Sequence, residues 1–157
     1  MDRTRRQALQ TGGGLTLAVL LGAAGWLRPG AAAAQAWNKG AFEAHALDET
    51  VKALGGSTPV QSKDVVFVAT PDIAENGAVV PVSIVSHVPG TESIAILIEK
   101  NPNMLAAVFD VPQGTEPALS TRVKMAQTSN VYALVKADGK YYVAAKEIKV
   151  TLGGCGG

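Results

Sequence analysis

The sequence predicts an all-β protein: an immunoglobulin-like β-sandwich of about seven strands, with an N-terminal helix and a flexible C-terminal arm. Two observations predict the sandwich. From Lys63 onward, apolar and β-branched residues recur with a period of two in short runs. Turn-forming pairs such as Asn-Gly, Pro-Gly and Asp-Gly separate those runs. Short strands divided by turns at this spacing are typical of sandwich folds.

The composition narrows the functional classes. The chain has 157 residues, of which 47% are hydrophobic and 17% charged, and its formal net charge is +1. This length fits one domain with a targeting segment. A charge so near zero gives no basic surface for nucleic acid. One cysteine and two histidines cannot form an intramolecular disulfide, a four-ligand zinc site or a cluster from this chain alone. We expect no metal and no cofactor.

Residues 1–36 have the pattern of a cleavable export signal. Basic residues, including Arg5 and Arg6, precede a weakly apolar run over residues 15–25, and small residues follow at 31–36. The apolar run is too short to span a bilayer, which takes roughly 20 residues. Cleavage after Ala34 or after Ala36 fits the A-x-A pattern.

The pair Arg5-Arg6 indicates the twin-arginine route, which exports proteins that are already folded. Leu9 fits that pattern, although Ala8 stands where phenylalanine is usual. The alternative is an ordinary secretory signal that carries two arginines. Cleavage would leave 37–157 with ten basic and twelve acidic residues, a net charge of −2. We expect a periplasmic protein with no membrane contact after cleavage.

The first element after the signal is an amphipathic helix over residues 39–54. Asn38 is a suitable N-cap, and Gly55-Gly56 is a suitable stop. The apolar residues recur at helical spacing, three or four residues apart except for the adjacent Ala46 and Leu47: Phe42, Ala46, Leu47, Val51 and Leu54.

The domain over residues 37–152 then continues as strands. The expected strands are 65–68, 79–86, 93–99, 104–109, 119–126, 131–136 and 141–150. Pro81 indicates an edge or bulged strand for 79–86, because proline lacks the N–H of a ladder. Asp138-Gly139 predicts a tight hairpin turn. Strands 79–85 and 94–98 are apolar enough to face a partner, but burial in the core is the favoured use.

Two other features invite a metal interpretation, which we do not favour. His45 and His87 have no other ligand at a suitable spacing, so each is expected to be solvated or packed. The acidic and amide residues over 72–77 lack the alternating oxygen ligands of a calcium loop. We expect a structural turn there.

The chain ends in Gly153-Gly154-Cys155-Gly156-Gly157, which predicts a swinging arm over residues 153–157. Glycines make a slim and flexible tether. Three residues span ~10 Å when extended, so the thiol can leave the domain and enter a narrow cleft. No cation adjoins Cys155 in the sequence to lower its pKa. This pattern is typical of a carrier, a covalent handle on which separate enzymes act.

Other interpretations of the tail remain open. The cysteine could be incidental, or it could form a structural disulfide with a partner or with a second copy of the chain. A ubiquitin-like sulfur carrier uses a terminal Gly-Gly carboxylate instead, but it is cytoplasmic and needs no cysteine near its end. The export signal argues against that class.

The whole mature chain resembles the SoxY family, the sulfur-carrier subunits of the periplasmic thiosulfate-oxidising (Sox) system. The terminal pentapeptide and the twin-arginine leader carry the resemblance. Further matching segments are 54–56, 71–82, 101–102, 121–125 and 146–150.

The resemblance implies a chemistry for Cys155. A separate c-type cytochrome would join thiosulfate oxidatively to its sulfur as an S-thiosulfonate. A hydrolase would release sulfate and leave a persulfide, and a sulfane dehydrogenase, where present, would oxidise the outer sulfur. The resemblance also implies a heterodimer with a SoxZ-like subunit and no catalytic residue in this chain.

Overall fold

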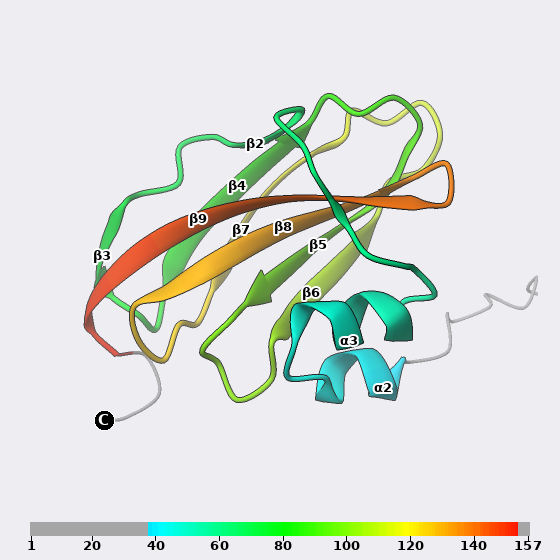
Figure 1. The fold of residues 1–157 in the computed structure, drawn as a ribbon. Coiled ribbons are helices and arrows are strands. Elements are labelled where there is room, and N and C mark those ends of the chain that lie inside the picture. Colours follow the sequence, from blue (N-terminus) through cyan, green and yellow to red (C-terminus); the bar gives the residue numbers. More distant parts are fainter. Residues whose placement is uncertain (1–37, 154–157) are drawn as a thin grey trace, which may run out of the picture. The chain divides into compact units, whose positions relative to one another are not determined.

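The computed structural model describes residues 38–153, which form two short helices and two β-sheets (Figure 1). The helices are α2 (Lys39–Glu43) and α3 (Leu47–Ala53). The strands are β1 (Val60–Gln61), β2 (Val65–Phe67), β3 (Ile73–Asn76), β4 (Val80–Ser86), β5 (Thr91–Ile98), β6 (Leu105–Asp110), β7 (Ala118–Val123), β8 (Ser129–Ala137) and β9 (Lys140–Leu152). Within these residues, no helix is long and apolar enough to cross a membrane.

The two sheets confirm the predicted all-β sandwich. The larger sheet has the order β1-β9-β8-β5-β6, and β3 also pairs with β9. The smaller sheet has the order β2-β4-β7. Adjacent strands are antiparallel except for β1 and β3, which both run parallel to β9.

The main core lies between the sheets. Alternate residues of β4, including Val82 and Ile84, meet alternate residues of β5, including Ile94 and Ile96, and all four side chains are fully buried. Alternation follows from the period of two in a strand. Burial in the core, the favoured use of residues 79–85 and 94–98, is therefore confirmed.

A second core lies on the other face of the larger sheet, where the helices pack. It joins Ala41 and Val51 of the helices to Ala95 and Leu97 of β5. Strand β5 is thus buried on both faces, which explains why residues 94–98 read as a continuous apolar run. The larger sheet supports two cores at once.

The prediction of one helix over 39–54 is wrong, because the helix breaks after Glu43. Ala44 adopts an extended backbone, and its carbonyl accepts a hydrogen bond from the Met104 N–H at 3.4 Å. Asn38 caps α2 as expected and also donates through Nδ2 to the Ala53 carbonyl at 2.7 Å. The break lets Ala41 and Val51 contact the same core.

The edge position predicted for the Pro81 strand is wrong for the strand as a whole, because β4 lies between β2 and β7. Its pairing with β2 covers only Ile84 to Ser86. Ser83 donates its N–H towards the β2 side, to Thr70 Oγ1. Pro81 has the same orientation, so its missing N–H faces a side that β2 does not reach.

The structural turn expected over residues 72–77 is also wrong for most of its length. Residues Ile73–Asn76 form β3, which pairs in parallel with the end of β9. Strand β1 was not predicted either. Each is a short strand that pairs with a distant segment, so neither has a local sequence pattern.

The predicted hairpin between β8 and β9 is confirmed. Asp138 and Gly139 both have positive φ, at 49° and 71°. Two consecutive residues of this kind form the type I′ turn that suits a two-residue hairpin. The hairpin starts β9, whose other end leads to the C-terminal tail (Figure 1).

Candidate functional site

The candidate site is the C-terminal end of β9, from which the tail continues. Gly153 is the one tail residue within the described part of the chain, and it is exposed. The other predicted site residues lie outside the described residues: Arg5, Arg6, Gly154, Cys155, Gly156 and Gly157. The structure therefore describes the root of the predicted arm.

Strand β3 holds one edge of this root. Asn76 lies opposite Leu152, and the Gly77 N–H donates to the Leu152 carbonyl at 2.7 Å. Thr151 Oγ1 donates to the Glu75 carbonyl at 2.9 Å. The last residues of β9 are therefore paired to the end of the strand.

The connection between β7 and β8 lies against the other side of the root. Pairing of β8 with β9 stops at Ser129 and Ile148. Beyond it, Thr128 Oγ1 accepts from the Val150 N–H at 3.0 Å. The Ala126 carbonyl oxygen comes so near Gly153 that a Cβ there would lie 2.5 Å from it. Gly153 is thus in close contact with backbone.

Asn101 fixes the segment that carries Ala126. Its Oδ1 accepts from the Ala126 N–H at 3.0 Å, and its Nδ2 donates to the Lys124 carbonyl at 2.8 Å. Between them, the Met125 N–H donates to the Gly77 carbonyl at 2.7 Å, and the Met125 side chain is fully buried. The two segments that flank the arm root, the end of β3 and the β7–β8 connection, are therefore hydrogen-bonded to each other.

Lys146 of β9 bonds the segment that connects β2 to β3. Its Nζ lies 3.1 Å from Asp72 Oδ1 and donates to the Thr70 carbonyl. Thr70 is buried, and its hydroxyl exchanges hydrogen bonds with the backbone of Ser83. These contacts bring the β2–β3 connection against β9, where β3 then pairs.

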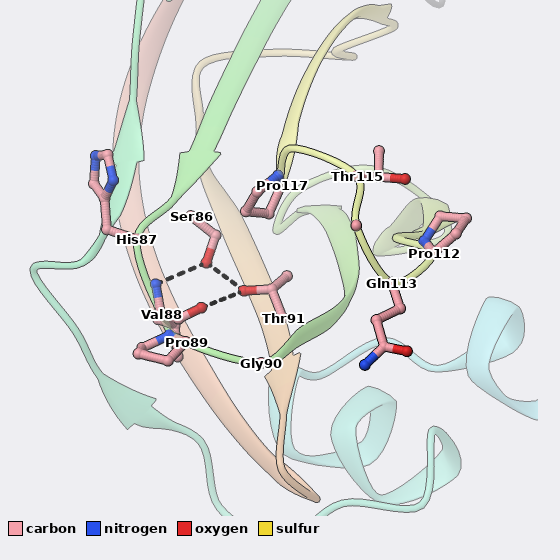
Figure 2. Close-up of a pocket in the computed structure, with 11 residues that line it drawn as sticks. Ser86, His87, Val88, Pro89, Gly90, Thr91, Pro112, Gln113, Thr115 and Pro117 are labelled. Atoms are coloured by element: carbon pink, nitrogen blue, oxygen red, sulfur yellow. Dashed lines mark hydrogen bonds between the residues drawn. The ribbon is translucent and has the colours of Figure 1, made fainter.

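A pocket of about 370 Å³ lies at the Ser86 end of β4, and Figure 2 shows the residues that line it. The loop from Ser86 to Thr91 and the loop from Pro112 to Pro117 line it. Ser86 Oγ and Thr91 Oγ1 lie 2.8 Å apart, and each also bonds backbone of Val88. These hydroxyls already have partners within the loop.

Glu92, the residue after Thr91 of this pocket, forms an ion pair. Lys136 Nζ is 2.9 Å from Glu92 Oε2, and both side chains are partly exposed. Hydrogen bonding to Lys136 lowers the pKa of the Glu92 carboxyl, and the same bond raises the pKa of Lys136. The ion pair links the neighbouring strands β5 and β8, which is a structural role.

The two histidines lie in different connecting segments of the fold. His45 lies between α2 and α3, where its backbone N–H donates to Glu49 Oε2 at 3.4 Å. His87 is exposed at the pocket, and its backbone N–H donates to the Asp64 carbonyl. Over residues 38–153, no three or more histidine, cysteine, aspartate or glutamate side chains are grouped to hold a metal.

Sequence reasoning missed the residues that hold the arm root. Asn76-Gly77 and Asn101-Pro102 were identified as turn pairs and as parts of segments that match the SoxY family, but no role at the arm root was assigned to them. The hydrogen-bond partners of Asn101 are 23 and 25 residues away, at Lys124 and Ala126. The dipeptide gives a signal for the turn but none for those partners.

Comparisons with known proteins place this geometry in a family. The family model described as sulfur oxidation protein SoxY matches residues 51–155. A solved structure of the sulfur carrier protein SoxY from Chlorobium limicola f thiosulfatophilum is 40% identical, with a TM-score of 0.61. The alignment covers 68% of this chain and 96% of that chain. No curated protein matches the chain by sequence.

A second solved structure concerns T cell activation by the bacterial superantigen toxic shock syndrome toxin-1. It is 17% identical, covers 55% of this chain and 98% of that chain, and has a TM-score of 0.38, too low to indicate a shared fold. The family match and the 40% identical structure agree with each other and with the sandwich described above. The chain belongs to the SoxY family of sulfur oxidation proteins.

Proposed function

We propose that the protein is a covalent sulfur carrier of thiosulfate oxidation, with Cys155 as the attachment point. The observation that carries the proposal is the family match, which extends to residue 155 and so includes the cysteine. Cys155 is the single cysteine of the chain. The arm root at Gly153, two residues before Cys155, is exposed.

The proposed cycle starts with an oxidation. The Cys155 thiol and thiosulfate form a sulfur–sulfur bond, which releases one proton and two electrons to a c-type cytochrome. The product is a cysteine S-thiosulfonate. Water then cleaves the terminal sulfone in a separate hydrolase, which yields sulfate and leaves a persulfide on Cys155. A sulfane dehydrogenase, where present, oxidises the outer sulfur to a sulfonate: water supplies the three oxygens, and six electrons pass to an electron acceptor such as a c-type cytochrome. A second hydrolysis then releases this group as sulfate and restores the Cys155 thiol.

In this scheme the chain is a substrate carrier and supplies no catalytic residue. The thiolate is the reactive form of cysteine, and its usual pKa is about 8.5. We propose that the enzymes which act on the arm activate it. The glycines at 154, 156 and 157 keep the arm slim enough to enter several active sites.

We also propose a location and a partner. The Arg5-Arg6 leader would direct the folded protein to the periplasm through the twin-arginine route. A SoxZ-like subunit would form a heterodimer with it, and export of an assembled pair would explain the use of a route for folded cargo. The remaining Sox enzymes would dock only transiently.

The test is the intact mass of the protein from the periplasmic fraction of cells growing on thiosulfate. We expect added sulfur, sulfite or thiosulfate on the C-terminal peptide, removed by a thiol reductant. Cys155→Ser should carry no adduct and abolish thiosulfate-dependent sulfate formation, because the attachment atom is lost. It should leave the unfolding curve unchanged.

Two outcomes would contradict the carrier role. One is a bare thiol throughout turnover, and the other is sulfate formation sustained by Cys155→Ser. A mass of twice the chain that reductant halves, without any smaller adduct, would favour the alternative in which Cys155 forms a structural disulfide. Recovery of the protein only in the cytoplasm would contradict the proposed export.

A further inference from the structure

We propose that Asn101 is a positioning residue of the sulfur-carrying arm. With Asn76, Gly77, Ala126 and Gly153 it forms a collar that fixes the arm root at Gly153, two residues before Cys155. The inference rests on the proposed function for its purpose, but the collar itself is a property of the described residues.

The first step is the pairing of the last strand. The carbonyl of Leu152 is bonded by the Gly77 N–H at 2.7 Å, and the N–H of Val150 is bonded by Thr128 Oγ1 at 3.0 Å. The strand end therefore has partners on both sides. Fraying at Leu152 would therefore break its hydrogen bond to the segment after β3, whereas fraying of an unpaired strand end breaks no hydrogen bond.

The second step concerns Gly153. Its φ is not in the positive region that favours glycine, so backbone conformation does not require glycine here. Space does, because a Cβ would lie 2.5 Å from the Ala126 carbonyl oxygen, closer than real Cβ atoms come. This glycine permits close packing of the root, whereas the sequence analysis assigned it to arm flexibility.

The third step is the support behind Ala126. The Ala126 carbonyl can restrict Gly153 only if the segment that carries it is itself fixed. The Asn101 side-chain amide fixes that segment through hydrogen bonds of 3.0 Å to the Ala126 N–H and 2.8 Å to the Lys124 carbonyl. The Met125 N–H adds a bond to Gly77, which itself bonds Leu152. Asn101, Ala126, Gly77 and the arm root thus form one connected network.

The collar shortens the length of chain between the fixed part of the domain and the Cys155 thiol. From a fixed Gly153, two residues reach Cys155, a span of ~7 Å, against ~10 Å if that length began at Leu152. The accessible volume scales with the cube of that reach. Fixing the root therefore raises the effective concentration of the thiol near the arm exit about threefold.

The experiment measures distances between two nitroxide labels, one on Cys155 and one on Ala145→Cys, an exposed position of β9. Asn101→Ala should broaden the distance distribution, because the Ala126 segment loses both side-chain bonds. Gly153→Ala should shift and broaden it as well, because the root must move off Ala126. Asn101→Asp should fall between, since it keeps an acceptor for the Ala126 N–H and loses the donor to Lys124.

The matched control is Asn103→Ala. Asn103 is an exposed asparagine of the same turn, and the structure gives its side chain no hydrogen bond among the described residues. This control should leave the distribution as in the wild type. Equal widths for Asn101→Ala and the wild type would overturn the collar, as would equal broadening by Asn103→Ala.

A second readout links the collar to turnover. In the complete Sox system without added labels, Asn101→Ala should lower kcat/KM for thiosulfate about threefold. Turnover that falls without broadened distances would also overturn the inference. The distance measurement needs no sulfur cargo, so a failure of the carrier role would leave its result intact.

Discussion

Gly56 lies where the helical segment meets the sheet, and its packing leaves no room for a side chain. A Cβ would lie 2.3 Å from Tyr141 Cδ2 and 2.9 Å from Val51 Cγ1. We expect Gly56→Ala to lower the free energy of unfolding by about 2 kcal/mol, the usual cost of forcing a well-packed ring to move. Urea denaturation followed by circular dichroism measures it.

The control for this substitution is Gly40→Ala in α2. A Cβ at Gly40 would meet only Asn38 Oδ1, at an ordinary contact distance of 3.8 Å. Because alanine favours helices over glycine, Gly40→Ala should raise stability by up to about 1 kcal/mol. A Gly56→Ala variant as stable as Gly40→Ala would show that Tyr141 yields freely.

Two glycines have packing roles that the sequence did not predict. Glycines used for turns, as at Gly139, could be predicted from their neighbours. Gly56 was predicted as a helix stop and Gly153 as part of a flexible tether, yet both also face distant atoms, at Tyr141 and Ala126. Packing against a residue far away in the chain has no local pattern, so sequence reasoning could not separate the two roles.

At the scale of elements, Tyr141 attaches the helical pair to the larger sheet. Its hydroxyl donates to the Leu54 carbonyl, just after α3, at 2.8 Å, and burial raises the pKa of the phenol. The folded state therefore holds the phenol proton more tightly than the unfolded state, where the pKa is about 10. This contribution to stability is complete below pH ~10 and is lost as the pH rises through the folded pKa.

Tyr141→Phe should remove the part of the stability loss at alkaline pH that comes from ionisation of the Tyr141 phenol. At pH 8 it should cost about 1 kcal/mol, because the Leu54 carbonyl loses its donor. Urea unfolding at pH 8 and pH 10.5 provides the comparison. Tyr142→Phe is the control, because the structure gives the Tyr142 hydroxyl no hydrogen bond over residues 38–153. If Tyr141→Phe lost as much stability as the wild type at high pH, burial of Tyr141 would not cause the effect.

The elements that could be predicted are those with a strong local period. The positions of β5, β6, β8 and the hairpin into β9 follow from alternating residues and turn pairs. The break after Glu43 does not, because a helical pattern runs through Ala44 and the bond to Met104 is tertiary. Strand β3 is likewise fixed by β9, a segment more than seventy residues later.

At the scale of the whole domain, the larger sheet is shared by the sandwich core and the helical core. Its strands contribute Ile94 and Ile96 to one face and Ala95 and Leu97 to the other. A helical pair of this length is too short to be stable alone. It is therefore expected to unfold with the sheet that it covers, in one transition.

Paired substitutions test this cooperativity. Val51→Ala in the helical core should cost about 2 kcal/mol, and Ile84→Val in the sandwich core about 1 kcal/mol, since both side chains are fully buried. Val51 and Ile84 belong to different clusters, so the double variant should lose about 3 kcal/mol, the sum for independent sites in one cooperative unit. Urea unfolding by circular dichroism and tyrosine fluorescence should then give coincident curves. If Val51→Ala instead produced a separate early transition, the helices would be an independent layer, and the contact of Tyr141 with Leu54 would not couple them to the sheet that leads to the arm.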